Sequence, residues 1–339
     1  MKAAVLQEDK SFVIEDRDAP PPGPGEARLD VAWCGVCGTD LHIYHGHMDA
    51  RVAFPEVIGH EASATVAEVG PGVTNVAPGD AVVVRPLDAC GQCGACQRGH
   101  GHICTQLNFI GIDSAGAFQN SWIVPAGLLH RLPDTLDLRR AAFIEPLAVA
   151  CHDVRMAELV EGETAVVLGG GPIGMLIALV AQAQGARVVL SELNPSRLEL
   201  AGTLGFTTVN PTQTDPKALV EEVTGGEGAD VVFEVSGAAP PIEMMTQLAR
   251  ARGRVVVVAI VPKPTPVDLF QVFWKELRII GTRVYEPEDY ERAIVLLEQG
   301  TVDPEPLITG QESLDTIGHA FESLISEPSH MKVLVDCRG

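Results

Sequence analysis

Four closely spaced cysteines point most directly to chemistry in this chain of 339 residues. They follow the pattern C-x2-C-x2-C-x7-C and are Cys90, Cys93, Cys96 and Cys104. Four thiolates in such a short loop can close a tetrahedron around Zn²⁺, and the glycines between them let the loop wrap around the ion. Because a shell of four thiolates leaves no position open for water, the spacing predicts a structural zinc site.

An iron–sulfur cluster is the alternative for this loop, since three cysteines at C-x2-C-x2-C also occur in bacterial ferredoxins. The ferredoxin pattern continues with x3-C-P, whereas here the fourth cysteine follows after seven residues and precedes Thr105. Zinc is therefore favoured. His100 and His102 lie in the same loop and could replace a cysteine as ligands, although loop histidines are more often only exposed.

A second set of metal-binding residue types lies in two segments closer to the start of the chain. Cys37 opens the segment C-G-T-D-L-H, and His60 and Glu61 end the segment G-H-E. A thiolate, an imidazole and a carboxylate suit a catalytic zinc that keeps one position open. Cys34 is more simply explained as a structural cysteine, although a thiol redox pair with Cys37 is a further alternative.

Glu145 is another carboxylate that could reach the same ion. It stands with Pro146 at the start of an expected helix, just before the second domain. An acidic residue at such a position is also stabilised by the positive end of the helix, without any metal. Both interpretations stay open on the sequence alone.

A glycine-rich turn lies between the apolar run Thr164–Leu168 and the helical run Met175–Gln184. Its pattern, G-x-G-x-x-G between a strand and a helix, is typical of dinucleotide-binding sites, because the glycines let the pyrophosphate approach the helix N-terminus. The residues of the turn that are expected to bind the cofactor are Gly169, Gly171, Pro172, Ile173 and Gly174.

Glu192 ends the next apolar run, where a carboxylate would bind the hydroxyl groups of the adenosine ribose. A carboxylate at that point repels the 2′-phosphate of NADP, so the sequence favours NAD as the cofactor. Arg197 argues for NADP instead, because its side chain could pair with that phosphate. Its place in the first turn of a helix explains it equally well.

The elements that must position these residues follow two different sequence patterns. Residues 1–152 contain short, turn-rich β segments, such as the run Ala81–Val84. In residues 153–284, apolar strands alternate with helical stretches, which predicts βαβ units and a parallel sheet. The strands expected there are Thr164–Leu168, Arg187–Ser191, Asp230–Val235 and Arg254–Ile260.

Residues 285–339 are expected to return to the first domain. Apolar residues at helical spacing predict a helix over Glu288–Gly300, and alternation predicts a strand over Lys332–Asp336.

Charge and composition argue against several classes of partner. The chain carries 24 basic and 45 acidic residues, a formal net charge of −21, which repels nucleic acid and anionic membrane surfaces. No apolar run reaches the length of about 18 residues that a membrane span needs, and the first residues lack the apolar core of a secretory signal. We therefore expect a cytoplasmic protein without nucleic-acid or membrane partners. In that reducing compartment, its eight cysteines are not expected to form structural disulfides, and the clustered spacing of some of them indicates metal binding.

Taken together, these motifs resemble the zinc-containing medium-chain dehydrogenase/reductase superfamily, and the match covers nearly the whole chain in the right order. The segments Glu145–Leu147 and Gly281–Tyr285 are most similar to the polyol, butanediol and threonine dehydrogenase branch. The resemblance implies an α/β fold in which a Rossmann domain, a doubly wound parallel sheet, is inserted into a GroES-like, mainly-β catalytic domain. It also implies a catalytic cleft between the two domains.

The resemblance assigns roles to individual residues as well. Thr39 matches the hydroxyl residue that takes the alcohol proton, and His42 matches the histidine that relays this proton to solvent. Phe118 and Tyr44 are considered as aromatic residues that line the substrate pocket, although a place in the core is the more common role of such residues. Water or the substrate oxygen would complete the catalytic zinc site. Its protein ligands would be Cys37, His60 and either Glu61 or Glu145.

The expected reaction is a zinc-dependent transfer of a hydride between NAD and a secondary alcohol, diol or polyol, or the corresponding ketone. Sorbitol dehydrogenases carry an Arg-Tyr pair in the late segment, where this chain has Val284 and Tyr285, so sorbitol itself is in doubt. The alternatives are an NADP-preferring member, an enzyme similar to L-threonine 3-dehydrogenase, and a non-catalytic protein that binds zinc and nucleotide. The resemblance also leads us to expect two Zn²⁺ per chain and a homotetramer or homodimer.

Overall fold

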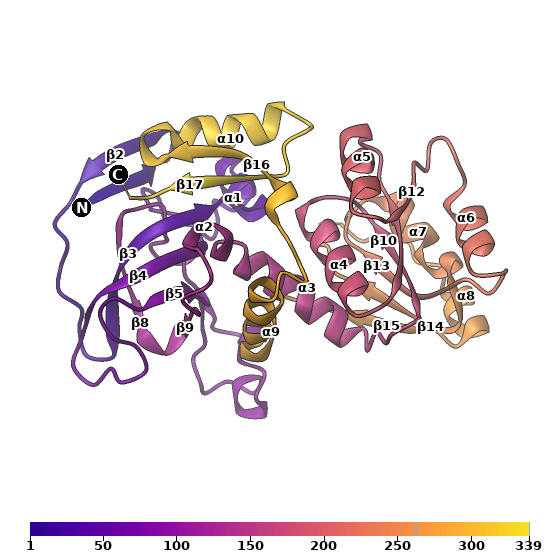
Figure 1. Ribbon diagram of the computed structural model, residues 1–339, viewed down its shortest axis with the longest axis horizontal. Helices are drawn as coiled ribbons and strands as arrows, with labels where there is room; N and C mark the ends of the chain where they lie inside the picture. Colours follow the sequence, from indigo (N-terminus) through magenta and orange to yellow (C-terminus); the bar gives the residue numbers. More distant parts are fainter. Residues whose placement is uncertain (262, 339) are drawn as a thin grey trace. The chain divides into compact units, whose positions relative to one another are not determined.

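The computed structural model describes residues 1–261 and 263–338, which form two compact units (Figure 1). The first unit consists of Met1–Pro146 and Glu286–Gly339, and the second consists of Leu147–Tyr285. The helix α3 (Ile144–Met156) contributes residues to both units. The boundary expected after residue 152 therefore falls inside this helix, and the boundary expected after residue 284 is one residue from the observed division.

The second unit is built on a sheet of six strands, as far as the described residues show. All of its strand pairs are parallel, in the order β12-β11-β10-β13-β14-β15. This order is that of a doubly wound dinucleotide-binding fold, whose ligand site lies at the carboxyl end of the first strand. The strands are β10 (Thr164–Leu168), β11 (Arg187–Ser191), β12 (Thr207–Val209), β13 (Ala229–Glu234), β14 (Ala249–Val257) and β15 (Arg278–Gly281).

Helices of the second unit begin where the sequence combines a capping side chain with proline. Asn194 caps α5 and Asp215 caps α6, and in each case proline is the next residue. The cap satisfies free backbone N–H groups, and proline suits the first helical position because no N–H is needed there. The helices are α4 (Pro172–Ala183), α5 (Pro195–Thr203), α6 (Pro216–Val223), α7 (Ala239–Leu248) and α8 (Leu269–Lys275).

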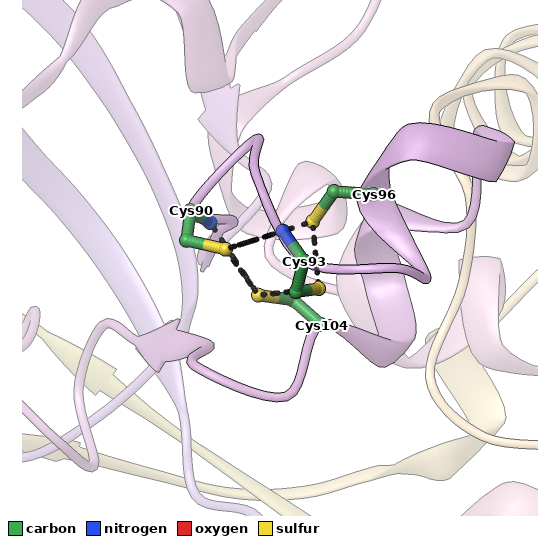
Figure 2. A group of neighbouring side chains, drawn as sticks. All are labelled: Cys90, Cys93, Cys96 and Cys104. Atoms are coloured by element: carbon green, nitrogen blue, oxygen red, sulfur yellow. Dashed lines mark hydrogen bonds between the residues drawn. The ribbon is translucent and has the colours of Figure 1, made fainter.

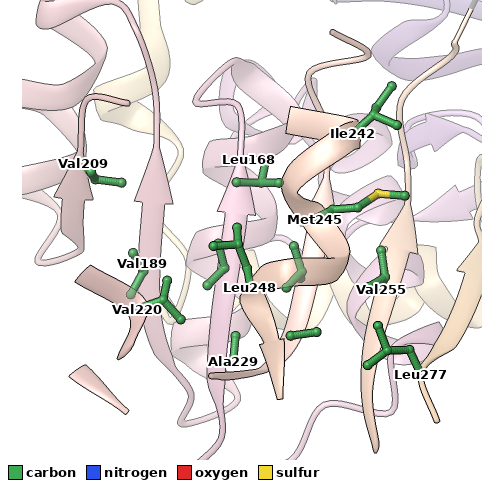
Figure 3. Packing of buried hydrophobic residues seen from close by; sticks show 13 residues of the cluster. Leu168, Val189, Val209, Val220, Ala229, Ile242, Met245, Leu248, Val255 and Leu277 are labelled. Carbon is green, nitrogen blue, oxygen red and sulfur yellow. The ribbon is translucent and has the colours of Figure 1, made fainter. Parts of the chain in front are cut away.

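Alternate residues of the strand β10 face opposite sides of the sheet. Val166 and Leu168 belong to a buried cluster with α6 and α7, which Figure 3 shows at close range. Val167 faces the other side and lies close to Gly174 of α4. Because β10 is covered on both faces, all five of its residues are buried, and its sequence is a continuous apolar run. The residues that the figure labels are Leu168, Val189, Val209, Val220, Ala229, Ile242, Met245, Leu248, Val255 and Leu277.

The first unit contains a mainly antiparallel sheet with strands from both ends of the chain. Its order is β16-β17-β3-β4-β5-β9, and β8 also pairs with β3. The late strand β17 pairs directly with the early strand β3, so Leu334 lies opposite Gly35. The strands are β3 (Glu26–Gly35), β4 (Glu61–Val69), β5 (Ala81–Val84), β8 (Ser121–Pro125), β9 (Leu129–Arg131), β16 (Ile308–Ser313) and β17 (Lys332–Asp336).

The remaining elements of the first unit are short. They are the paired strands β1 (Lys2–Leu6) and β2 (Phe12–Asp16), the paired strands β6 (Leu87–Asp88) and β7 (Asn108–Phe109), and the helices α1 (Gly38–Tyr44), α2 (Leu138–Ala141), α9 (Pro287–Glu298) and α10 (Ile317–Ser326). Single 3-10 turns are formed by Cys96–Arg98, Gly101–Ile103, Ala126–Leu128, Glu305–Leu307 and Leu314–Thr316.

Several elements expected from the sequence have the same bounds in the structure. They are Ala81–Val84, Thr164–Leu168, Arg187–Ser191 and Lys332–Asp336. The strand expected to run to Ile260 ends at Val257, because Val258 and Ala259 both direct their N–H groups to the carbonyl oxygen of Glu234 and leave the ladder. The helix expected over Glu288–Gly300 begins one residue earlier and ends at Glu298.

Among the described residues, 1–261 and 263–338, no helix has the length and apolar character that crossing a membrane requires.

Candidate metal and dinucleotide sites

Cys37, His60 and Glu61 come together at the ends of two paired strands. Cys37 lies just after β3 and caps α1, whereas His60 precedes β4 and Glu61 begins it. The pairing of β3 with β4 sets Gly35 opposite Glu61, and this register brings the two segments into contact. One ligand atom from each of the three side chains lies within 4.8 Å of the others. His60 and Glu61 are only 2% and 1% exposed, so the site is shielded from bulk water.

Asp40 is a site residue that the sequence analysis did not identify. Its side chain is fully buried, and its Oδ2 accepts a hydrogen bond of 2.8 Å from the backbone N–H of Cys37. Its Oδ1 lies 3.5 Å from Nδ1 of His60. Asp40 therefore fixes the start of α1 and orients the imidazole, as a carboxylate behind a metal-bound histidine does. Its spacing from Cys37 indicates only a helix cap, because the contact with His60 is tertiary.

The surroundings of His60 favour positive charge. Burial opposes the charged imidazole, but Asp40 and Cys37 outweigh this effect and raise the pKa of His60 well above its usual value. The thiol of Cys37 and the carboxylate of Glu61 beside this buried imidazole form a donor set that suits a divalent cation. The residues present therefore fit a zinc ion.

Lys332 is the second site residue that the sequence analysis missed. Its Nζ lies 2.7 Å from both carboxylate oxygens of Glu61 and donates a further bond of 3.1 Å to the carbonyl oxygen of Val36. Lys332 is only 2% exposed. Although burial opposes its charge, Glu61 and Cys37 raise its pKa. The sequence signal that could have identified this residue is a lysine directly before the three apolar residues of the predicted strand.

Gly35 creates the space in which this ion pair forms. The strand β3 runs between β4 and β17, with Glu61 opposite Gly35 on one side and Leu334 on the other. A Cβ atom on Gly35 would lie 2.1 Å from Oε2 of Glu61, a distance that no real contact tolerates. The absence of a side chain at this position therefore lets the Glu61 carboxylate and the Lys332 ammonium meet over the strand.

Glu145 lies in the first turn of α3 and is 6% exposed. Its negative charge contributes to the raised pKa of Lys332, so its carboxylate lies in the electrostatic environment of the Glu61 pair. The cluster within 4.8 Å consists of Cys37, His60 and Glu61. The structure thus brings Glu61 to the other two ligand candidates and leaves Glu145 as a neighbouring carboxylate.

The two expected proton-transfer residues both lie on α1. Thr39 is half-buried in its first turn, two residues after Cys37. His42 is exposed one turn later, and its Nδ1 lies 3.2 Å from Nδ1 of His47. The helix α1 therefore begins at the metal-ligand cluster and carries Thr39 near this cluster and His42 at the solvent-exposed surface.

The two aromatic residues considered for a substrate pocket have different surroundings. Phe118 is fully buried in the core, and its ring leaves no room for a Cβ on Gly59. Tyr44 is half-buried, stacks on Phe12 and also contacts Phe321, and it lines a surface cavity together with Phe12.

Cys34 behaves as a core thiol. It is fully buried in β3, and burial raises the pKa of its thiol well above the usual value. A thiol that stays protonated is a poor nucleophile for disulfide exchange. Cys34 and Cys37 therefore lack the properties of a redox pair.

The four cysteines of the loop form a compact sulfur cluster (Figure 2). Sulfur–sulfur distances are 3.4 Å for Cys93–Cys96 and for Cys90–Cys104, 3.8 Å for Cys93–Cys104 and 4.0 Å for Cys90–Cys96. Thiolates in a tetrahedron around zinc, with Zn–S bonds of about 2.3 Å, are separated by about 3.8 Å. The observed distances fit that arrangement, and all eight cysteines of the chain are free of disulfides.

Backbone N–H groups prepare this cluster for negative charge. Those of Gln92 and Cys93 point to the sulfur of Cys90, and that of Gln106 points to the sulfur of Cys104. Hydrogen bonds from the backbone at Cys96 and Thr105 lower the pKa of Cys93 to about 5. The loop therefore stabilises the thiolate form, which binds metal, at Cys93, whereas burial and the neighbouring thiols of Cys93 and Cys104 raise the pKa of Cys96 to about 12. His100 and His102 take no part in this cluster and lie instead beside Glu286.

The glycine-rich turn joins β10 to α4, with Gly171 as the cap of the helix. No side chain caps this helix, so the N–H groups of its first turn can donate hydrogen bonds to a phosphate group. A Cβ on Gly174 would lie 1.9 Å from the carbonyl oxygen of Gly169, so only glycine permits this close packing of helix and turn. Pro172 and Ile173, which lie between these two glycine positions, are the first two residues of the helix.

Glu192 lies at the end of β11, next to the same turn. Its Oε2 accepts a bond of 2.7 Å from the N–H of Gly170, and its Oε1 accepts bonds from the N–H groups of Leu193 and Asn194. These bonds fix the position of the carboxylate at the mouth of the turn. The guanidinium of Arg197 comes within 4.0 Å of Glu192 Oε2, so its charge is directed toward this carboxylate.

Comparison with known protein families identifies two matching regions. Residues 23–134 match the model of the alcohol dehydrogenase GroES-like domain, and residues 172–299 match that of the zinc-binding dehydrogenase. The matches cover most of the chain.

Similar proteins are known at full length. The chain is 53% identical over 339 residues to 2-dehydro-3-deoxy-L-galactonate 5-dehydrogenase of Pseudoalteromonas atlantica, covering 100% of this chain and 99% of that protein. The crystal structure of 2R,3R-butanediol dehydrogenase from Bacillus subtilis superimposes with a TM-score of 0.91 at 35% identity, covering 99% of both chains. A protein from Sinorhizobium meliloti bound to NADP has a TM-score of 0.91 at 33% identity, covering 99% of this chain and 98% of that one.

Proposed function

Because the chain belongs to the zinc-containing medium-chain dehydrogenase/reductase superfamily, we propose that it oxidises a secondary hydroxyl group of a 2-dehydro-3-deoxy sugar acid. Two predictions from the sequence are confirmed by this membership: the fold class, and a reaction in the class of alcohol and polyol oxidoreduction. The observation that supports the proposed substrate is the 53% identity to a 2-dehydro-3-deoxy-L-galactonate 5-dehydrogenase along the whole chain.

In this proposal, Cys37, His60 and Glu61 hold a catalytic zinc ion, and Glu145 is the second carboxylate beside it. The convergence of the three ligand atoms within 4.8 Å supports this assignment, together with the burial of His60 and Glu61. When bound, zinc supplies a Lewis acid that stabilises negative charge on the substrate oxygen.

Lys332 reduces the negative charge of this site. Its acidic groups outnumber the charge of one divalent ion, because the carboxyl group of Asp40, buried beside His60, adds to Cys37, Glu61 and Glu145. The ammonium of Lys332, in contact with both oxygens of Glu61, offsets part of this excess. A substrate hydroxyl group that loses its proton then meets a less negative environment, and this lowers the free energy that its charge costs.

Thr39 and His42 would carry the proton of the substrate hydroxyl group to solvent. Thr39 lies in the first turn of α1, two residues after the proposed ligand Cys37, and the exposed imidazole of His42 follows three residues later. A hydroxyl group can accept and donate a proton in turn, and an imidazole can do the same through its two ring nitrogens. The nicotinamide cofactor would accept the hydride.

We propose NAD as that cofactor, because three backbone N–H groups hold the carboxylate of Glu192 at the mouth of the glycine turn. A carboxylate there binds the ribose hydroxyl groups of NAD and repels the additional phosphate of NADP. Arg197 is directed toward Glu192, which reduces its availability for a phosphate. A similar protein bound to NADP makes the opposite preference the alternative to be tested.

The four-cysteine cluster would hold a second, structural zinc ion. Its sulfur distances support this proposal, as does the low pKa of Cys93. Thiol ligands that stay reduced agree with the cytoplasmic location that we propose.

The second unit also presents a surface suited to self-association. Phe270, Phe273 and Trp274 on α8 are 61%, 76% and 71% exposed, and β15 forms the edge of the sheet with its ladder open. Exposed aromatic clusters and open sheet edges are both typical of interfaces between subunits. We propose that this surface, formed by α8 and β15, joins two copies of the chain in a homo-oligomer.

The substrate proposal is tested by NAD reduction with the holoenzyme. The panel would contain 2-dehydro-3-deoxy-L-galactonate, sorbitol, 2,3-butanediol and L-threonine. We expect the highest kcat/KM with the sugar acid, and a Cys37→Ser variant should lose most turnover while NAD affinity is kept. A higher kcat/KM with any of the other three compounds would refute the proposed substrate. Unchanged turnover of Cys37→Ser would refute the proposed zinc site.

A further inference from the structure

A third cluster of metal-binding side chains lies in the first unit, outside both sites described above. His100 and His102 belong to the four-cysteine loop, and Glu286 precedes α9. One ligand atom from each residue lies within 4.8 Å of the others. Nδ1 of His102 is 3.4 Å from Oε1 of Glu286, and Nδ1 of His100 is 3.7 Å from the same oxygen. Two imidazoles thus face a single carboxylate oxygen.

The four-cysteine loop holds the two histidines in place. Both lie between Cys96 and Cys104, which are anchored in the sulfur cluster at either end of this segment. His100 caps the 3-10 turn Gly101–Ile103, and His102 lies within it. The rings are nearly perpendicular, with centroids 6.1 Å apart. The segment therefore presents two imidazoles side by side on a support that is fixed at both ends.

Hydrogen bonds at the start of α9 also fix the position of Glu286, which faces the two histidines. It caps α9, and its carboxylate accepts a hydrogen bond from the N–H of Asp289, while the N–H of Glu286 donates to the carboxylate of Asp289 at 2.8 Å. A helix N-terminus favours an ionised carboxylate. Glu286 is therefore oriented, and a charged oxygen faces the histidines.

The distances within this cluster match ligands around an ion better than direct hydrogen bonds. Other histidine–glutamate pairs in the first unit have N–O distances of 2.5 Å (His130–Glu291), 2.6 Å (His319–Glu312) and 3.2 Å (His330–Glu327). The distances at Glu286, 3.4 and 3.7 Å, are longer than all of these and lie beyond the usual range for a hydrogen bond. Zinc bound at about 2.0–2.2 Å by nitrogen and oxygen sets neighbouring ligands about 3.3–3.5 Å apart.

We propose that His100, His102 and Glu286 form a further zinc site, separate from the four-cysteine cluster and from the Cys37 site. Two imidazoles and a carboxylate form a recognised ligand set for Zn²⁺, and water completes the coordination on the side where His100 is exposed. The ion links the cysteine loop to the start of α9. It thereby stabilises the contact between two segments that are far apart in sequence.

Equilibrium dialysis of the metal-loaded full-length protein against buffered free Zn²⁺ tests the proposal. The variants are His100→Ala/His102→Ala and Glu286→Gln. The matched control is His319→Ala, which breaks a histidine–glutamate pair that belongs to none of the three-residue ligand clusters found within residues 1–261 and 263–338. We expect both variants to bind one Zn²⁺ per chain fewer than the parent, with turnover unchanged, and the control to match the parent. Equal zinc content in the parent and the double-histidine variant would overturn the proposal.

A second measurement identifies which site is lost. Co²⁺ bound by thiolates gives strong sulfur-to-metal charge-transfer absorption, whereas Co²⁺ bound by nitrogen and oxygen gives only weak visible bands. We expect the double-histidine variant to keep the full charge-transfer absorption and to lose the Zn²⁺-dependent rise in Tm that binding to the folded state produces. Loss of the charge-transfer absorption would show that the histidines belong to the sulfur site, and it would refute the separate site.

Discussion

The ammonium group of Lys332 lies 2.7 Å from both carboxylate oxygens of Glu61, and the two side chains are 2% and 1% exposed. The residues are 271 positions apart in sequence. Antiparallel pairing on both sides of β3 brings them together over Gly35. This ion pair links the last strand of the chain to the proposed catalytic zinc site.

Replacing Lys332 by Met should destabilise the fold by about 3–5 kcal/mol, because Glu61 would remain buried without a counter-charge. Urea unfolding of the metal-free protein measures the change. Lys217→Met is the control, since Lys217 and Glu221 form an exposed pair on a helix and their interaction is worth less than about 1 kcal/mol. The double variant Lys332→Met/Glu61→Gln should recover part of the loss. An equal loss in the double variant would contradict the pairing argument.

Replacing Gly35 by Ala should move the Glu61 carboxylate, because the new Cβ would lie 2.1 Å from Oε2. Overpacking of this kind costs about 1–3 kcal/mol. We also expect weaker zinc binding at the Cys37 site, measured by competition with a chelator. Gly202→Ala is the control, since a Cβ there meets nothing within 4 Å. Zinc affinity equal to that of the parent would show that Glu61 is not a ligand.

Replacing Cys93 by Ser should remove the zinc ion of the four-cysteine cluster and lower Tm. The loop has little apolar surface of its own to bury, so its order would depend on the ion. Metal analysis should show one Zn²⁺ fewer per chain, and Co²⁺ substitution should show loss of the charge-transfer absorption. A Tm unchanged from the parent would rule out a structural role for the ion.

Glu192 can be changed in two steps that separate its charge from its hydrogen bonds. Glu192→Gln keeps an acceptor for the N–H of Gly170 and removes the charge, whereas Glu192→Ala removes both. We expect Gln to reduce the preference for NAD over NADP about tenfold or more, because repulsion of the 2′-phosphate is lost. Ala should in addition weaken NAD binding. Titration with NADH and with NADPH, followed by the fluorescence of the reduced nicotinamide, gives both affinities. An unchanged NADH/NADPH affinity ratio would exclude Glu192 as the discriminating residue.

Replacing Trp274 by Glu should disrupt the proposed interface between subunits, because a charge would be placed within the exposed aromatic surface of α8. Light scattering after gel filtration measures the molar mass. Val160→Glu is the control, as Val160 is also an exposed apolar residue of the second unit, at 56% exposure, and lies outside α8 and β15. If Trp274→Glu keeps the mass of the parent, the interface lies elsewhere.

The sequence alone determined the features that depend on local spacing. The four cysteines lie within one loop, and the glycine turn lies between one strand and the next helix, so their chemistry can be inferred from neighbouring residues. The alternation of apolar strands with helices likewise predicts a parallel sheet. These features were sufficient to predict the family and the fold class.

Only the tertiary structure decided which charged groups meet. Asp40 could be identified from sequence only as a helix cap, and Lys332 only as the first residue of a strand, yet both contact proposed zinc ligands. His100 and His102 were considered as substitutes for a cysteine, and they lie instead beside Glu286. The physical reason is that such contacts depend on strand register and helix position across long separations in sequence, and local propensity carries no information about them.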